Sequence, residues 1–468
     1  MRSLEELALA VGGRVMRCAE GAASGVSIDS RTLRAGDLFF ALKGPNFDGH
    51  RFLGSAYASG AWGAVVEDAA ANAAAAGTQS GALIAVDDTT RALQEMARAR
   101  RAEFDSPFVA VTGSLGKTTN KEMIAHVLGS RFRVMKSEGN LNNHLGIPLT
   151  LLRASEDSDV AVFELAMTEL GEIRFLAEMV RPAIGVVTNV AEVHLESMGS
   201  LEAIARAKSE LVEALPADGY ALLNWDDPRV RAMAPSSRAQ VLSYGLGEGA
   251  RLRAHSVEID DTGTVFTIDG GGSVRIPVWG RHLVYAALAA IGCAELLGVP
   301  AQESRDRLAR FRPLAGRSAF RPLGAVRLLD DSYNASPASV RAAVLALCDR
   351  PGAASRVVAL GDMLELGERA EALHAELGEF IAQQPIDLLL LYGPLSEATR
   401  RGALAAGLPA TRAIHFATRE ALAAALRDRL QPRDHLLVKG SRGMAMEKVI
   451  ALIESDLPAA IRAPGGEA

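Results

Sequence analysis

The chain has 468 residues, of which 49% are hydrophobic and 23% charged, and 50 basic against 56 acidic side chains give a net charge of −6. At roughly 150 residues a domain, this length predicts about three domains. The composition excludes an intrinsically disordered chain and argues against nucleic acid as a partner, because a phosphate backbone requires a basic surplus.

No targeting or membrane-spanning segment is predicted. The first ten residues carry Glu5 and Glu6 and no apolar run, which indicates a helix rather than a signal peptide. The longest apolar helical stretch, residues 284–299, contains Glu295 and is too short to span a bilayer. The three cysteines lie far apart and indicate neither a disulfide framework nor a zinc site. We therefore expect a cytoplasmic protein that does not insert into membranes. We also expect a monomer.

Residues 1–86 predict a small α+β domain. Short strand-like runs at 37–41 and 62–66 alternate with glycine and proline turns, and an alanine-rich helix or linker follows at 68–76.

Residues 87–313 predict a domain with a mainly parallel sheet. Buried-strand runs at 108–112, 160–163 and 184–188 alternate with amphipathic helical stretches, which is typical of βαβ units. Between residues 250 and 278, short strands alternate with Asp/Gly turns. We expect a hairpin insertion there, at the edge of the sheet and before a helix at 282–297.

Residues 314–468 predict a doubly wound, Rossmann-like α/β domain. Four strand-like runs are each followed by a helical pattern: 326–329, 356–360, 388–392 and 435–439. No GxGxxG follows any of them, so the dinucleotide fingerprint of a dehydrogenase is missing. The last residues, from Pro464, are expected to form a disordered tail.

The most specific motif is TGSLGKTT, which follows the strand at 108–111 and precedes a helix. Phosphate binding needs backbone N–H groups at a helix N-terminus, glycines that let the ligand approach, a lysine and a hydroxyl for magnesium. The residues that supply them are Gly113, Ser114, Leu115, Gly116, Lys117, Thr118 and Thr119. A full Walker pattern has a further glycine where Val111 stands, so this loop is a shortened form. The alternative is a glycine turn that caps a helix beside a solvated lysine.

Further polar residues stand at the carboxyl ends of predicted strands, where doubly wound sheets bind ligands. Glu164 follows one strand, and Asn189, His194 and Glu196 follow the next. A carboxylate and an imidazole on neighbouring loops could hold a second Mg²⁺. The alternatives are a helix-capping carboxylate at Glu164 and an exposed loop histidine at His194.

The third domain carries a comparable polar rim. Asp330 and Asp331 end one strand, and Ser336-Pro337 is an N-cap and first-turn pair that starts a helix. Charged, glycine-bearing loops at 361–367 and 439–442 end two further strands. Adjacent acids at a strand end favour a ribose, metal or amine contact. The alternative is that one of the two carboxylates is structural.

Motifs spread over nearly the whole chain carry a family resemblance. They are Asp29-Ser30-Arg31, Ala41-Leu42-Lys43-Gly44, Asp48-Gly49-His50, the TGSLGKTT loop, Gly139-Asn140-Leu141-Asn142-Asn143, Asp330 to Ala335, Gly361 to Gly367 and Val438 to Arg442. With them the chain resembles the Mur ligases of peptidoglycan synthesis, and within that family the members that add D-alanyl-D-alanine. The DNPR-type motif of the members that add the third amino acid is not found.

The resemblance implies a role for each matched residue. The UDP end of the substrate would contact Ser30, Arg31, Lys43, Asp48 and His50, with Asn140, Asn142 and Asn143 near its sugar-peptide arm. ATP would contact residues 113–119, Arg317 and Asp331. The catalytic set would be Lys117, Glu164, His194 and Lys208, and Mg²⁺ would bind Thr118, Glu164, His194 and Lys208 as its carbamate. The D-Ala-D-Ala side would be Tyr333, Asn334, Ser441 and Arg442.

The activity implied by the resemblance is ATP-dependent ligation in cell-wall synthesis, which supports cell shape and division. D-alanyl-D-alanine would join UDP-N-acetylmuramoyl-tripeptide through an acyl phosphate and give the pentapeptide, ADP and phosphate. Two other functions remain as alternatives. One is a Mur-type ligase that adds a different amino acid, and the other is a nucleotide-dependent switch that forms no bond.

Two departures from the family pattern have consequences. Leu283 and Ala286 stand where the family has the asparagines of an HNxxN pattern, so adenine must be contacted by other groups. Leu165-Ala166 and Thr168-Glu169 replace the usual Leu-Gly and Asn-His after Glu164, so some contact to the peptide must differ.

Overall fold

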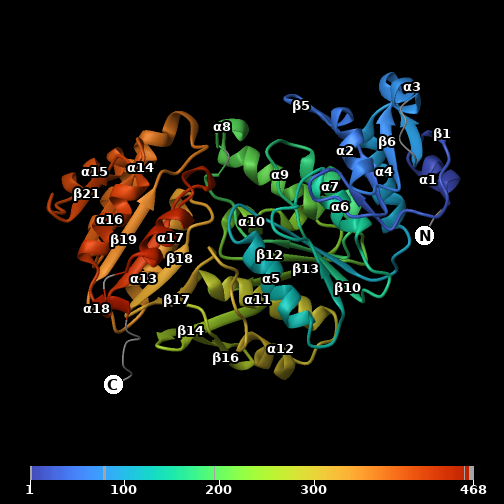
Figure 1. The fold of residues 1–468 in the computed structure, drawn as a ribbon. Helices are drawn as coiled ribbons and strands as arrows, with labels where there is room; N and C mark the ends of the chain where they lie inside the picture. Colours follow the sequence, from blue (N-terminus) through green and yellow to red (C-terminus); the bar gives the residue numbers. More distant parts are fainter. Residues whose placement is uncertain (1–2, 77–80, 194, 458, 463–468) are drawn as a thin grey trace. The chain divides into compact units, whose positions relative to one another are not determined.

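The structure is a computed structural model that describes residues 3–76, 81–193, 195–457 and 459–462 (Figure 1). Contacts divide the chain into two compact units. The first contains Met1–Ala110, Phe132–Met167 and Gly171–Ile184, and the second contains Val111–Arg131, Thr168–Leu170 and Gly185–Ala468. We expected His194 to bind metal and the residues from Pro464 onward to form a disordered tail. These residues lie outside the part of the chain that the structure describes.

The first unit contains a five-stranded sheet of order β1-β7-β6-β3-β2, in which only β1 is antiparallel to its neighbour. Successive residues of one strand enter two different cores. Leu38 and Phe40 pack with helices α1 and α4, whereas Phe39 packs with α2 and α3. Because both faces are covered, β3 is an uninterrupted apolar run, which is why its sequence already predicted a strand.

The elements of this unit have the following bounds. Its strands are β1 Arg14–Arg17, β2 Gly25–Ser27, β3 Asp37–Phe40, β4 Lys43–Gly44, β5 Phe47–Asp48, β6 Gly63–Glu67, β7 Ala82–Val86, β9 Val134–Lys136 and β10 Val160–Glu164, with β4 and β5 forming a separate hairpin and β9 and β10 pairing in parallel. Its helices are α1 Leu4–Ala10, η1 Gly49–Phe52, α2 Leu53–Ala58, α3 Asp68–Ala76, α4 Thr89–Arg101, α6 Gly146–Leu152 and α7 Glu172–Val180. The helix expected at the start is α1, closed by a capping box of Ser3 and Glu6.

In the second unit, strands follow one another in the order β16-β15-β14-β13-β12-β11-β8. The expected hairpin insertion is confirmed, because β14, β15 and β16 pair antiparallel and lie at the sheet edge. The strands are β8 Phe108–Thr112, β11 Ile184–Val187, β12 Tyr220–Asn224, β13 Gln240–Gly245, β14 Leu252–Asp260, β15 Gly263–Ile268 and β16 Gly272–Ile276. The first three residues of β8 and the first residue of β11 are assigned to the first unit. The helices are α5 Lys117–Leu128, α8 Leu195–Met198, α9 Leu201–Ala214, α10 Pro228–Arg231, η2 Ala234–Ser236, α11 His282–Leu296 and α12 Ala301–Leu308.

The C-terminal part of this unit has a six-stranded sheet of order β17-β18-β22-β19-β20-β21, parallel except for β17. One face packs on α13, α14 and α15 and the other on α16, α17 and α18, which confirms the doubly wound prediction. The strands are β17 Ala319–Leu323, β18 Val326–Asp331, β19 Arg356–Gly361, β20 Leu388–Tyr392, β21 Ala413–Phe416 and β22 His435–Lys439. The helices are α13 Pro337–Asp349, η3 Gly367–Arg369, α14 Ala370–Ala382, α15 Ser396–Ala405, α16 Arg419–Arg429, η4 Arg442–Met444, α17 Glu447–Ser455 and α18 Ala459–Arg462.

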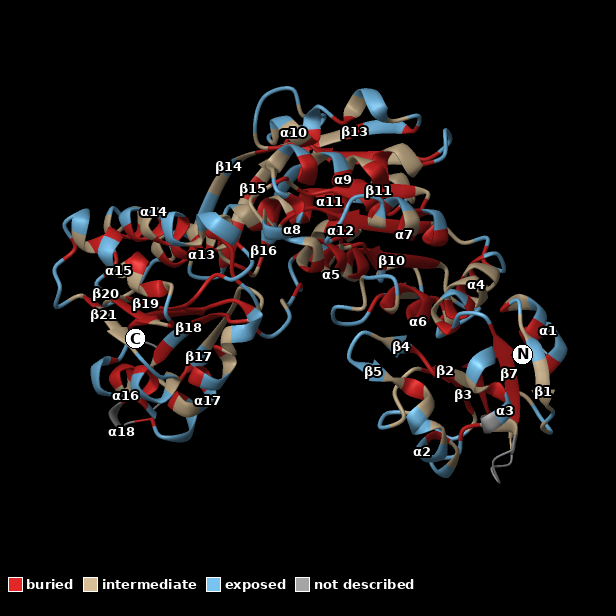
Figure 2. Cartoon of the chain, turned by 90° about the horizontal axis from the view of Figure 1, so that it is seen from above, coloured by how far each residue is buried: buried red, intermediate tan, exposed pale blue. Residues whose placement is uncertain are grey.

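Burial follows the sheets (Figure 2). The strands β8, β10, β11 and β22 consist of buried residues from end to end, so the residues that follow them are held at fixed positions on a rigid base. Among the described residues, no helix combines the length and the apolar character that crossing a bilayer requires.

Candidate functional site

The TGSLGKTT loop lies between β8, which ends at Thr112, and α5, which begins at Lys117. Its two glycines have conformations that other residues rarely adopt. Gly113 has a φ of +148°, and a Cβ there would lie 1.9 Å from Oγ1 of Thr188. Gly116 is the N-cap of α5 with a φ of +76°. The backbone therefore turns into the helix with its first N–H groups directed away from the helix, the arrangement that binds phosphate oxygens.

The loop is held in place by the residues after β11. The carbonyl oxygen of Leu115 accepts hydrogen bonds from Thr188 Oγ1 at 2.7 Å and Asn189 Nδ2 at 3.1 Å. The N–H of Leu115 donates to Asn189 Oδ1 at 2.9 Å, and that of Ser114 to the Asn189 carbonyl at 2.9 Å. Sequence reasoning missed this role of Thr188, although its place directly after a buried strand was a signal.

The side chains that would meet phosphate and metal come from the first turn of α5. The ammonium of Lys117 donates to the carbonyl oxygens of Gly113 at 2.9 Å and Ser114 at 3.3 Å. Thr118 is buried beside it. The lysine side chain therefore lies over the loop. In phosphate-binding loops of this type, the lysine contacts the phosphates.

A small open pocket adjoins this turn. Its lining residues are Thr118, Thr119, Glu122, Phe311, Pro313, Leu314 and Arg317. The structure thus brings Arg317, which lies some two hundred residues further along the chain, to the phosphate loop. A guanidinium there is suited to phosphate oxygens.

Two expected metal ligands, Glu164 and Lys208, are buried. Glu164 ends β10 with 3% exposure in the first unit, and its Oε1 accepts a hydrogen bond from Asn142 Nδ2 at 2.9 Å. Lys208 lies on α9 in the second unit with 1% exposure. Within the described residues, no group of three or more His, Cys, Asp or Glu side chains could hold a metal ion.

Three of the expected UDP-binding residues lie together after β3. Asp48 and Lys43 are partners across the β4–β5 hairpin. The Asp48 carboxylate accepts from the backbone N–H of His50 at 3.0 Å and contacts Nδ1 of the imidazole at 2.6 Å, and these bonds lower the pKa of Asp48. Because Nε2 of His50 accepts from the Glu67 N–H at 2.9 Å, Nδ1 carries the proton.

The remaining residues of this group have local partners. Arg31, beside a half-buried Ser30, binds the Asp29 carboxylate through two nitrogens at 2.9 and 2.6 Å, which lowers the pKa of Asp29 to about 2. The Asn143 side chain accepts from the N–H groups at the start of α6, so it is a cap, and Asn140 is exposed. The three asparagines thus differ in environment, with only Asn142 joined to Glu164.

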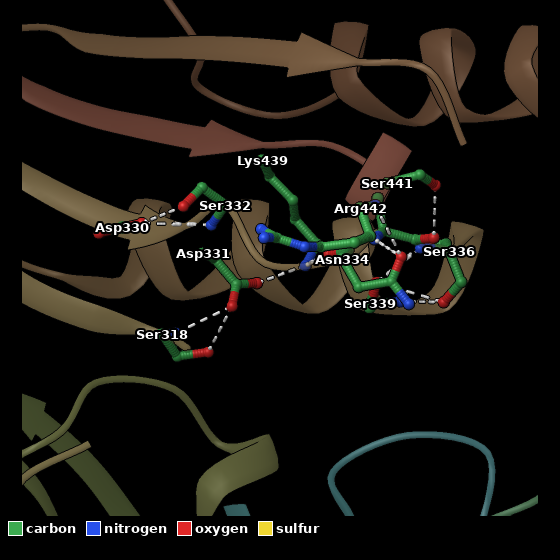
Figure 3. Close-up of polar contacts among 11 residues, drawn as sticks. Ser318, Asp330, Asp331, Ser332, Asn334, Ser336, Ser339, Lys439, Ser441 and Arg442 are labelled. Atoms are coloured by element: carbon green, nitrogen blue, oxygen red, sulfur yellow. Dashed lines mark hydrogen bonds and ion pairs between the residues drawn. The ribbon is translucent and has the colours of Figure 1, made fainter. Parts of the chain in front are cut away.

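In the C-terminal sheet, Asp331 ends β18 and Lys439 ends the neighbouring strand β22 (Figure 3). The lysine ammonium donates to Oδ2 of Asp331 at 2.5 Å and to the carbonyl oxygen of Asn334 at 2.8 Å. The other carboxylate oxygen of Asp331 accepts from the N–H of Ser318 at 2.8 Å. Sequence reasoning assigned Asp331 and Asn334 to different ligands and did not connect them.

Tyr333 contacts two arginines of the expected site. Its ring centre is 3.8 Å from the guanidinium carbon of Arg317 and 5.5 Å from that of Arg442. The backbone N–H of Arg442 donates to Oδ1 of Asn334 at 3.3 Å, and Ser441 accepts from the Leu364 N–H at 2.8 Å. Cation–π contacts of this kind hold an aromatic ring in a defined position.

The two departures in the HNxxN pattern lie inside helix α11. Leu283 and Ala286 are 4% and 1% exposed and belong to the hydrophobic core. Between them, Tyr285 donates its hydroxyl to Oδ2 of Asp226 at 2.9 Å. His282 begins the helix, and desolvation lowers its pKa to about 4. The imidazole is therefore neutral at pH 7 and can both donate and accept hydrogen bonds.

Comparison with known proteins matches the chain along most of its length. Family models match as the Mur ligase family catalytic domain at residues 22–101, the Mur ligase middle domain at 111–294 and the Mur ligase glutamate ligase domain at 316–442. The UDP-N-acetylmuramoyl-tripeptide–D-alanyl-D-alanine ligase of Bacillus subtilis is 36% identical over 436 residues, which are 92% of this chain and 94% of the relative. The ligase of the same description from Escherichia coli is 36% identical over 440 residues, which are 92% and 94%.

Solved structures agree with the sequence comparison. A crystal structure of MurF from Acinetobacter baumannii superposes with a TM-score of 0.88 at 30% identity and covers 97% of this chain and 99% of its own. MurF ligase from Thermotoga maritima in complex with ADP superposes with a TM-score of 0.80 at 28% identity, covering 92% and 97%. From the domain matches and the full-length relatives it follows that this chain belongs to the Mur ligase family.

Proposed function

We propose that this protein joins D-alanyl-D-alanine to UDP-N-acetylmuramoyl-tripeptide at the expense of ATP, in the synthesis of the peptidoglycan precursor. The observation that carries the proposal is the full-length match to relatives of that description, combined with a phosphate loop whose two glycines have the required backbone. The acceptor's terminal carboxylate attacks the γ-phosphorus of ATP, which gives an acyl phosphate and ADP. The dipeptide amine then attacks the acyl carbon and phosphate leaves.

The chain's residues act by positioning and by neutralising charge. The N–H groups of Gly116 to Thr119 bind the phosphates, because those of Ser114 and Leu115 already donate to Asn189. The Lys117 ammonium, which contacts the Gly113 carbonyl oxygen, neutralises phosphate charge. Arg317 adds a cation at the pocket beside Thr118, and Asp331 contacts the nucleotide from the C-terminal sheet. No covalent bond to the enzyme is required.

The residues present fit magnesium. Thr118 offers a hydroxyl in the first turn of α5, and Glu164 offers a carboxylate whose orientation is fixed by Asn142, and oxygen ligands of both kinds suit Mg²⁺. Lys208, at 1% exposure, would join them as its carbamate, with His194 as a further ligand. Bound Mg²⁺ would offset the negative charge that develops on the phosphates.

The two other substrates bind at opposite ends of the sequence. Ser30, Arg31, Lys43, Asp48 and His50 hold the UDP end, and Asn140, Asn142 and Asn143 lie toward the sugar-peptide arm. Tyr333, Asn334, Ser441 and Arg442 receive the dipeptide. In this division, residues 1–86 bind the UDP substrate, 87–313 bind ATP, and 314–468 complete the ligase site. We place the enzyme in the cytoplasm as a monomer.

The proposal is tested by incubating the protein with ATP, Mg²⁺, D-Ala-D-Ala and UDP-N-acetylmuramoyl-tripeptide that ends in either lysine or diaminopimelate, and then weighing the product. The proposal is supported if the product is heavier than the acceptor by the mass of the dipeptide less one water. The acceptor that the enzyme prefers identifies the third residue of the peptide. A nucleotide switch would hydrolyse ATP slowly whichever co-substrate is added. Another Mur-type ligase would release ADP with a different amine.

A further inference from the structure

Lys439 is a buried lysine at the end of a strand. It is the last residue of β22, with 3% exposure, and a lysine so far from water requires compensating partners. Its two partners come from different parts of the polar rim: the Asp331 carboxylate at the end of β18, and the Asn334 carbonyl oxygen three residues further on.

Each partner belongs to a group of residues that we assign to a different substrate. Asp331 is the residue proposed to contact the nucleotide, and its second carboxylate oxygen is already held by Ser318. Asn334 belongs to the dipeptide side, and its Oδ1 accepts from the N–H groups of Ala335 and Arg442. Figure 3 shows the lysine side chain between these two groups.

We propose that Lys439 is a positioning residue that fixes the nucleotide contact at Asp331 and the dipeptide loop at Asn334 relative to one another. The inference rests on the proposed function, because it uses the substrates assigned there. An ammonium has three N–H donors and no fixed plane, so it can bond a carboxylate and a carbonyl in different directions. Removing it leaves Asp331 able to move and the 334–335 turn without its anchor, and each change affects a different substrate.

A merely stabilising ion pair would behave differently. Loss of folded protein lowers the apparent kcat and leaves every KM unchanged, because the remaining molecules are normal. Loss of positioning raises the KM for ATP and for the dipeptide together, while the KM for the UDP substrate stays the same. The pattern across the three substrates therefore distinguishes the two roles.

The test uses the full-length protein with Lys439→Met, which keeps most of the length of the unbranched side chain and removes the charge. Lys448→Met, an exposed lysine on α17 in the same domain, is the control. Calorimetry with Mg-ADP measures nucleotide binding without turnover. We expect the Kd for ADP to rise about tenfold to a hundredfold, the loss expected for one charge-assisted hydrogen bond. Both KM values should rise in parallel, and the control should match the wild type.

A second pair of variants keeps the test decisive if Lys439→Met folds poorly. Asp331→Asn retains the shape of the side chain, and the double variant Asp331→Asn/Lys439→Met leaves no unpaired buried charge. If the pair acts as one unit, the double variant binds ADP no more weakly than the worse single variant. Additive losses, an ADP Kd within twofold of wild type in Lys439→Met, or an equal rise in the KM for the UDP substrate overturns the proposal. Absence of product from the wild type would instead count against the proposed function.

Discussion

Replacing Gly113 by alanine should disable the phosphate loop and destabilise the protein. A Cβ at this position would lie 1.9 Å from Oγ1 and 3.0 Å from Cβ of Thr188, and 3.2 Å from the backbone nitrogen of Asn189. No real Cβ lies as close to an oxygen as the first of these distances, so the Thr188 side chain must rotate or the loop must move.

The cost has two parts. Rotating Thr188 breaks its 2.7 Å hydrogen bond to the Leu115 carbonyl, which is worth about 1 kcal/mol. The φ of +148° at Gly113 is strained for alanine, which adds roughly 1 to 3 kcal/mol. We therefore expect the free energy of unfolding to fall by about 2 to 4 kcal/mol. Because the strain lies in the loop proposed to bind the phosphates, ADP binding should be lost as well.

Urea unfolding and calorimetry with Mg-ADP measure the two effects. Gly298→Ala is the matched control, since Gly298 also has a positive φ, +74°, but a Cβ there meets nothing within 4 Å. It should cost only about 1 kcal/mol and leave ADP binding unchanged. Thr188→Ala should destabilise the wild type but not the Gly113→Ala variant, because the atom that clashes is then absent. If Gly113→Ala proves as stable as the control and binds ADP normally, the reasoning from the glycine conformation is refuted.

Further changes test other parts of the site. Lys117→Ala should abolish ADP formation in a folded protein, and activity within about tenfold of wild type would show that the loop is misassigned. Lys208→Ala should be nearly inactive and partly rescued by a small added carboxylate, whereas a fully active variant would end the carbamate proposal. With Leu283 and Ala286 in the core, kcat/KM should favour ATP over GTP by only about tenfold or less, since each missing hydrogen bond is worth about 0.5 to 1.5 kcal/mol, and a thousandfold preference contradicts this. Desolvation lowers the pKa of His435 from 6.5 to about 4, so the unfolded chain takes up a proton first and stability should fall as the pH drops from 6.5 to 4, by at most about 3 kcal/mol for this residue. His435→Leu should flatten that part of the stability curve, and an unchanged slope would exclude the histidine as its cause.

Sequence patterns correctly predicted the local elements, whose formation depends on residues close together in the chain. The order of strand, glycine loop and helix at 108–128 follows from local propensity and burial, and the structure has it. Ser336 and Pro337 likewise start α13 as their types predict.

Contacts between distant residues were beyond the reach of the sequence. Nothing in the residues around Lys439 shows that its ammonium meets Asp331, because the pairing depends on β22 lying next to β18 rather than next to its sequence neighbour. For the same reason Leu283 and Ala286 were interpreted only as missing amides. Their burial in α11 depends on packing that no local pattern specifies.

The hydrogen bonds between Leu115 and the residues after β11 have a consequence for biosynthesis. The phosphate loop is complete as a sequence once the ribosome has passed Thr119, but Thr188 and Asn189 come about seventy residues later and are needed to hold it. Val190 in turn is bonded to Asp227. A nascent chain released before this point would contain every residue of the nucleotide motif and still lack its shape. During translation, nucleotide binding should therefore not arise before residues as far as Asp227 have left the exit tunnel, and truncated fragments that end earlier should not be retained on immobilised ATP.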